Sequence, residues 1–355
     1  MAFLLASLLV PVLNSIANKT SDLKDDLSEG QNSGNRVAAG LGIMLAVILS
    51  FQLWSVNDIH TFHPYFFASL ALFLVSGYVA GKGFATSLVR IGIQFSAAAV
   101  LIVGVSGEVG GFLGLMGFEG YSIYFSVLFL SGIFTLIAFL FKYISRVPEM
   151  AGGIAIIITS VLGIWFWAAG FFNMALFSFI VSASIIGYMM CRTNLKSAKL
   201  GKFGWSSMGF VIAFLMMEFL LANSMVAGEE IHLVNGMGLI LSLLIIPMVI
   251  WAADLISRKG LQIEDKRSGY FLVNLYGRLG MDKNQISFLF WMINLIIIGM
   301  AYSTMHLNVS IQAVILIGFG VLYTVATHKA ILFTKILSRK VSKVEANWVR
   351  NWIKD

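Results

Sequence analysis

Cysteine and charged side chains are both scarce in this sequence. Cys191 is the single cysteine, which excludes an internal framework of disulfide bonds. Only 12% of the 355 residues are charged, whereas a soluble domain carries about a quarter. The strict alternation of apolar and polar residues that marks a membrane-spanning strand is also missing, which excludes a barrel of strands. These absences point away from disulfide-stabilised, soluble and barrel-forming proteins.

Long apolar segments take the place of the missing charge. Hydrophobic residues make up 59% of the chain, and the mean hydropathy is +0.89. Many segments reach the length of about 18 apolar residues that crosses the hydrocarbon as a helix. The sequence therefore predicts an all-α, polytopic membrane protein with about eleven transmembrane helices. We expect them near residues 2–17, 37–54, 64–80, 88–105, 122–141, 151–169, 171–190, 205–223, 236–256, 286–305 and 309–333.

Basic residues divide the predicted loops into two groups. All 24 lysines and arginines lie in or beside alternate loops, or near the C-terminus. The opposite loops, among them VNDIHTFHP and ANSMVAGEEIHLVNG, contain none. Because cytosolic loops are enriched in Lys and Arg, we expect the N-terminus outside and the C-terminus in the cytosol. Residues 1–333 would then form one transmembrane domain with cytosolic loops 18–36, 81–88, 142–150, 191–204 and 257–285, followed by a basic cytosolic tail, 334–355.

The net charge of +7 is then a signal of topology and of contact with lipid headgroups. It does not predict a nucleic-acid partner, because no basic module interleaved with aromatic residues is present. Loops on a rigid scaffold commonly carry function, and the predicted cytosolic loops are the longer, more polar ones. We therefore expect chemistry or recognition at the cytosolic face.

Four segments in a fixed order carry a resemblance to a known family. They are SGYVAGKGFATSLVRIGIQFSAAAVLI, EMAGGIAIIITSVLGI, NLKSAKLGKFGWSSMGF, and IIPMVIWAADLISRKGLQIEDKR followed by LYGRLGMDKNQ. Their order and topology resemble the polyprenyl-phosphate N-acetylhexosamine-1-phosphate transferases (glycosyltransferase family 4), which include the phospho-MurNAc-pentapeptide translocase. Members join a nucleotide-sugar phosphate to undecaprenyl phosphate with Mg²⁺. The resemblance implies a multi-pass protein of the bacterial inner (cytoplasmic) membrane, with polyprenyl phosphate and UDP-sugars as candidate ligands.

The acidic residues of that family are missing where the resemblance would place them. Ala80 and Gly81 stand in place of two adjacent aspartates, and no acidic residue occurs from 59 to 107 or from 150 to 217. The expected histidine cluster is also missing from SGYFLVNLYGRLG. Mg²⁺ needs carboxylate oxygens, and phosphoryl transfer relies on the metal to neutralise developing charge. We therefore expect no metal site and no cofactor. If the chain is instead an active enzyme with relocated ligands, we expect it to bind Mg²⁺.

Two acidic residues are weak candidates for a catalytic role. Asp254 lies near the end of a predicted helix, and intramembrane acids are functional suspects. The simpler interpretation, which we favour, pairs it with Arg258 one turn away. Glu149 lies at the predicted start of a helix, where an acid interacts favourably with the helix dipole. That structural interpretation is also the one we favour for Glu149.

Basic residues crowd the loops that would line the family's metal site. One interpretation is cytosolic positive charge that only sets the topology, and this is the one we favour. The other is an anion clamp in which Arg gives bidentate contacts to phosphate and Lys gives point charges. The candidate phosphate- or lipid-binding residues are Lys82, Arg90, Lys142, Arg146, Lys199 and Lys202.

The segment KYISRVPEMAGG, residues 142–153, joins several of these features. Pro148 fixes its own φ and disfavours helix at Val147, so we expect the chain to break there and restart as a helix. Gly152 and Gly153 would then permit close packing against a neighbouring helix.

Two classes of function remain. The one we favour is a catalytically degenerate homologue that binds polyprenyl phosphate or a partner in cell-envelope polysaccharide synthesis. That partner would be a second copy of the chain or another synthesis protein. The alternative is an active transferase that moves a UDP-sugar phosphate to undecaprenyl phosphate.

Overall fold

The computed structural model describes residues 64–81, 87–104, 123–194, 200, 202–226, 232–260, 281, 283–308, 310–323 and 325. The named helices in these ranges are α3 (Pro64–Gly81), α4 (Ser87–Gly104), α6 (Ile123–Ile144), α7 (Pro148–Ala168), α8 (Phe172–Asn194), α9 (Lys202–Met225), α10 (Gly236–Gly260) and α12 (Lys283–Ser303). A shorter apolar helix, Ser310–Tyr323, follows α12. No strand occurs in the described residues, so the predicted all-α class is confirmed for this part of the chain.

Six of the described helices are long and apolar enough to cross a membrane, namely α6, α7, α8, α9, α10 and α12. A helix satisfies its backbone hydrogen bonds internally, as the hydrocarbon requires. The chain is therefore a multi-pass membrane protein. The predicted helices 2–17 and 37–54 lie outside the described residues. The total of about eleven spans and the orientation of the termini stay predictions.

Several helices extend beyond their predicted ends into the predicted loops. The expected loop 142–150 consists of only three residues, 145–147, because Lys142 belongs to α6 and Glu149 to α7. In the same way, residues 191–194 belong to α8 and residues 257–260 to α10. Charged residues such as Lys and Glu are good helix formers, so the change from apolar to polar sequence did not mark the helix ends.

The break before α7 confirms the prediction made from Pro148. Val147 has φ −116° and ψ 89°, in the extended region that proline favours for the preceding residue. Pro148 lies in the first turn of α7, where its missing N–H costs no hydrogen bond. The predicted close packing is also confirmed, because Gly152 lies against Met189 of α8 and Gly153 against the indole of Trp291 in α12.

A short turn at Gly170 reverses the chain between α7 and α8. Gly170 has φ +80°, a left-handed conformation that glycine adopts without steric cost. The backbone N–H of Phe171 donates to the Phe166 carbonyl at 2.9 Å, which closes the end of α7. The two helices then pack along each other as an antiparallel pair.

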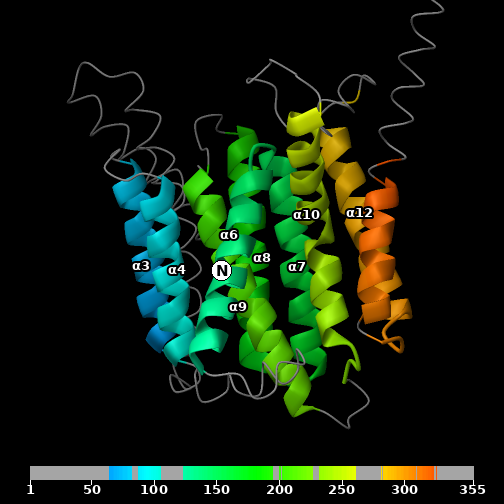
Figure 1. The fold of residues 1–355 in the computed structure, drawn as a ribbon, viewed down its shortest axis with the longest axis horizontal. Helices are drawn as coiled ribbons and strands as arrows, with labels where there is room; N and C mark the ends of the chain where they lie inside the picture. The colour runs from blue at the N-terminus through cyan, green and yellow to red at the C-terminus, as the bar shows by residue number, and fades with distance from the viewer. Residues whose placement is uncertain are drawn as a thin grey trace, which may run out of the picture.

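Helix α9 lies at the centre of the bundle. In its apolar window 83% of the residues are buried, the largest share of the six spans. Phe210 and Phe214 of α9 contact Phe73 and Phe66 of α3, with ring centroids 4.9 Å and 4.3 Å apart. In Figure 1, α3 and α4 lie together at one end of the row of helices, and α10, α12 and the orange helix Ser310–Tyr323 lie toward the other. Helix α6 packs against both α9 and α10, and the candidate site lies along its α10 side.

Candidate functional site

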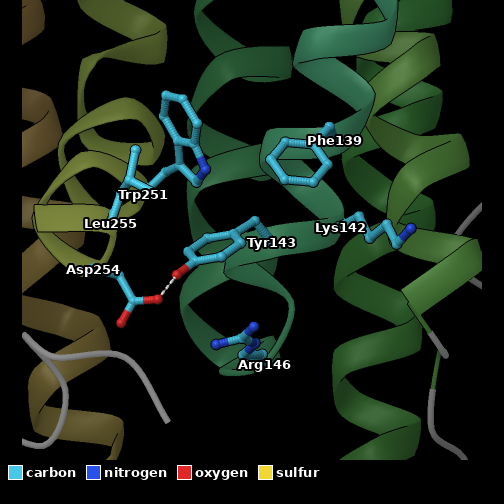
Figure 2. A pocket seen from close by; sticks show the side chains of 7 residues that line it. All are labelled: Phe139, Lys142, Tyr143, Arg146, Trp251, Asp254 and Leu255. Carbon is cyan, nitrogen blue, oxygen red and sulfur yellow. Dashed lines mark hydrogen bonds between the residues drawn. The ribbon is translucent and has the colours of Figure 1, made fainter. Parts of the chain in front are cut away.

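A cavity of about 310 Å³ lies between the C-terminal end of α6 and the C-terminal half of α10. The wall from α6 uses residues spaced by three and four, which is one face of a helix. Arg146, from the turn that follows α6, continues this wall. The residues that line the cavity are Phe139, Lys142, Tyr143, Arg146, Trp251, Asp254 and Leu255 (Figure 2). The sequence predicts this end of α6 and α10 to face the cytosol.

Two contacts join the walls of the cavity. The Tyr143 hydroxyl donates a hydrogen bond to the Asp254 carboxylate, which is drawn as a dashed line in Figure 2. One turn away, the ring of Phe139 meets the ring of Trp251 edge-on, with centroids 6.3 Å apart and planes 88° apart. Asp254 is only 6% exposed, and a buried carboxylate requires such partners. The hydrogen bond therefore both satisfies the acid and holds α6 to α10.

The two basic residues of the cavity have different surroundings. The Arg146 guanidinium carbon lies over the Tyr143 ring, 4.8 Å from its centroid, which is the geometry of a cation–π interaction. Figure 2 shows the Lys142 ammonium on the opposite side of Tyr143 from Asp254. Among the lining residues, two cations and one carboxylate leave one positive charge in excess. The cavity thus combines a net positive charge with the apolar surfaces of Phe139, Trp251 and Leu255.

Three of the sequence-predicted residues meet at this cavity, namely Lys142, Arg146 and Asp254. In the structure Asp254 accepts a hydrogen bond from Tyr143 of another helix, and its predicted pairing with Arg258 stays a prediction. The Arg258 side chain lies outside the described residues. So do Lys82, Lys199 and the side chains of Arg90 and Lys202, and their predicted role in phosphate binding stays a prediction.

Glu149 lies elsewhere and has a structural partner. It is in the first turn of α7, where the sequence predicts a favourable interaction with the helix dipole. Its carboxylate Oε1 also forms an ion pair with Arg192 Nη2 at the end of α8, at 3.0 Å. Because Glu149 does not line the cavity, the structure gives no support to a catalytic role for it there.

Sequence reasoning missed four residues that shape these contacts, Phe139, Tyr143, Trp251 and Arg192. Aromatic side chains are common in apolar helices, so Phe139 and Trp251 carried no distinctive signal. Tyr143 did carry one, because it follows Lys142 and precedes Arg146 by three positions at a helix end. Its role as the link to Asp254 depends on the packing of α6 against α10, which no local pattern contains.

Within the described ranges, no three His, Cys, Asp or Glu side chains gather closely enough to hold a metal ion. At the cavity, Asp254 is the only acid among the lining residues. One carboxylate supplies too few oxygen ligands for a protein-held Mg²⁺ ion. The donor set of this cavity therefore suits an anion better than a divalent cation.

The chain matches no protein-family model and no curated protein.

Proposed function

We propose that this protein is a non-catalytic relative of the sugar-1-phosphate transferases that binds polyprenyl phosphate between α6 and α10. The cavity that joins Lys142, Arg146 and an aromatic wall is the observation that carries the proposal. The resemblance to the transferases suggests polyprenyl phosphate as the lipid. The absence of the family's acidic residues from the expected positions suggests that the protein does not catalyse the transfer. On this proposal the protein works in the bacterial inner membrane, in cell-envelope polysaccharide synthesis.

The chemistry of the cavity fits the head of a phosphorylated lipid. Arg146 is exposed and Lys142 is partly exposed, so both can meet a ligand without first leaving a buried position. A hydrogen bond to a charged group makes a net contribution of about 1.5–3 kcal/mol. Phe139, Trp251 and Leu255 offer apolar surface to the first carbons of the chain. A phosphate joined directly to a hydrocarbon uses both kinds of surface.

The proposal is tested by titrating purified protein in nanodiscs with undecaprenyl phosphate, with native mass spectrometry as the readout. Undecaprenol, which has the same chain without the phosphate, is the ligand control. We expect the phosphate to bind at least about tenfold more tightly, because the alcohol forms no charge-assisted hydrogen bonds. Equal affinities for the two lipids would overturn the proposal. Phosphatidic acid with equal affinity would contradict its polyprenyl part.

The protein control separates the cavity from the general effect of positive charge. Lys142→Ala/Arg146→Ala should weaken undecaprenyl phosphate binding about tenfold or more. Lys335→Ala/Arg339→Ala removes the same charge from the predicted tail and should leave the affinity near that of the wild type. Equal losses in the two double variants would mean that the cavity has no special role.

One observation favours the active alternative, namely that Asp254 lines the same cavity as the two cations. In that case the carboxylate would serve the transfer of a UDP-sugar phosphate to undecaprenyl phosphate. The decisive assay follows the release of UMP from a panel of UDP-sugars with Mg²⁺ or Mn²⁺. Turnover that Asp254→Asn abolishes would establish the alternative, and the proposal expects no turnover.

A further inference from the structure

We infer that Asp254 is a positioning residue of this cavity, which acts through Tyr143 to hold Arg146 where an anion would meet it. The inference rests on the proposed function, because it concerns how the same cavity binds its phosphate. It assigns Asp254 a role other than the ion pair or the catalytic acid that the sequence suggested.

The first step is the link between the two helices. Asp254 of α10 accepts a hydrogen bond from the Tyr143 hydroxyl of α6. The hydroxyl lies at the far end of the ring from the Cβ atom, so anchoring it restricts where the ring can lie. Asp254 is 6% exposed and Trp251 packs one turn away, so the anchor itself is held in the interior. Asp254 therefore holds the Tyr143 ring in its position between the two helices.

The second step is the link from the ring to the cation. The Arg146 guanidinium carbon lies 4.8 Å from the centroid of the Tyr143 ring. An oxygen that accepts the phenol hydrogen bond polarises the ring toward greater negative charge, which strengthens its attraction for a cation on its face. The same hydrogen bond thus positions the ring and reinforces its attraction for Arg146.

This arrangement has a consequence for binding. Arg146 is exposed, and an exposed arginine samples many rotamers, which an anion would have to restrict at a cost in entropy. Stacking on Tyr143 restricts them before the anion arrives. Lys142 lies on the other side of Tyr143 from Asp254 (Figure 2), whereas Arg146 lies over the Tyr143 ring. We therefore expect the effect of Asp254 on phosphate binding to pass through Arg146.

A simpler account of Asp254 predicts the opposite sign. A carboxylate that lines the cavity repels an anion, so its removal alone would tighten binding. The positioning role predicts weaker binding after the same removal, because Arg146 loses its support. Asp254→Asn separates the effect of the carboxylate charge from the effect of the hydrogen bond. It removes the charge, while its amide oxygen can still accept the Tyr143 hydrogen bond. We expect that variant to bind about as well as the wild type or better.

The first experiment needs no lipid. The arginine reagent phenylglyoxal is applied to purified protein, and the modification rate of Arg146 is followed by mass spectrometry, with Arg192 as the internal reference. Asp254→Leu and Tyr143→Phe should each raise the Arg146 rate about threefold or more, and Asp254→Asn should not. Unchanged Arg146 rates in both Asp254→Leu and Tyr143→Phe would overturn the inference. If Asp254→Leu fails to fold, the Tyr143→Phe variant decides alone.

The second experiment is a titration with undecaprenyl phosphate. Asp254→Leu and Tyr143→Phe should each weaken binding about threefold to tenfold. Neither substitution should weaken binding further when Arg146→Ala is already present. The inference would be overturned if Asp254→Leu bound more tightly than the wild type, or if either substitution weakened binding as much in the Arg146→Ala variant as in the wild type. If the wild-type protein binds no undecaprenyl phosphate, the proposed function fails, while the phenylglyoxal rates still decide the role of Asp254.

Discussion

Gly209 of α9 lies so close to Ala138 of α6 that a methyl group on Gly209 would be 2.8 Å from the Ala138 Cα atom. The same methyl group would be 3.0 Å from the Ile137 carbonyl oxygen. Both neighbours are backbone atoms, which cannot rotate away. Helices in membranes associate through small residues that permit such close approach. The packing of α6 on the central helix α9 therefore depends on glycine at position 209.

Gly209→Ala should lower the free energy of unfolding by about 1–3 kcal/mol, the usual cost of inserting a methyl group into a packed interface. The measurement is reversible unfolding in mixed micelles. Gly132→Ala on α6 is the matched control, because no atom lies within 4 Å of the added methyl group. That control should be neutral or more stable by up to about 1 kcal/mol, since alanine favours helix. Equal loss in both variants would contradict the packing argument.

The Glu149–Arg192 ion pair should make a small and separable contribution to stability. Its side chains are 30% and 23% exposed, so solvent screens much of the attraction, and we expect a coupling energy of about 0.5–1 kcal/mol. A double-mutant cycle of Glu149→Gln and Arg192→Gln measures it by the same unfolding assay. Glu149→Gln should lower the free energy of unfolding by more than the coupling energy, because it also removes an acid from the first turn of α7. A coupling energy of zero would show that the pair contributes nothing.

Much of the helical architecture follows from simple physical signals in the sequence. Apolar length predicted the spanning helices because the hydrocarbon imposes it. The restrictions that Pro148 places on backbone torsions predicted the break at Val147. The ends of α6 and α7 were placed less well, since Lys142 and Glu149 continue their helices. A helix end depends on hydrogen bonds and capping, which polarity alone does not report.

The candidate site was predictable only in its parts. Asp254 was suspected because acids within a membrane are costly, and Lys142 and Arg146 because they lie in a loop that the resemblance places at the metal site. Their meeting was not predicted, because Tyr143 and Asp254 are 111 residues apart and their contact depends on which face of α10 packs on α6. The local rule of spacing four residues favoured Arg258 as a partner of Asp254, and that pair stays a prediction. Tertiary packing adds a neighbour, Tyr143, that a pattern within one helix could not reveal.

Calorimetry should detect no micromolar binding of Mn²⁺ at the cavity. Asp254 is the only carboxylate that lines it, and Lys142 and Arg146 would repel a divalent cation. Asp254→Asn is the control that tests whether any heat of binding comes from this site. Stoichiometric binding of Mn²⁺ that disappears in Asp254→Asn would contradict both the anion-binding site and the non-catalytic function.

The orientation in the membrane can be tested by labelling introduced cysteines with an impermeant thiol reagent. Cys191→Ser first removes the native thiol, and single cysteines are then placed at opposite ends of the bundle. Val234 is 72% exposed, whereas Asn223 is only 6% exposed and its amide exchanges hydrogen bonds with the Leu233 backbone. Val234→Cys is therefore the better probe of the end that the sequence predicts to be external. Arg146→Cys, at an exposed position, is the probe of the predicted cytosolic end.

In intact cells Val234→Cys should react with the reagent and Arg146→Cys should not, because the basic residues place position 146 on the cytosolic side. After the membrane is permeabilised, both should react, which controls for the intrinsic reactivity of each thiol. If only Arg146→Cys were labelled in intact cells, the orientation of the chain in the membrane would be the opposite of the predicted one. The cavity between α6 and α10 would then face away from the cytosol, where no UDP-sugar or cytosolic partner could reach it.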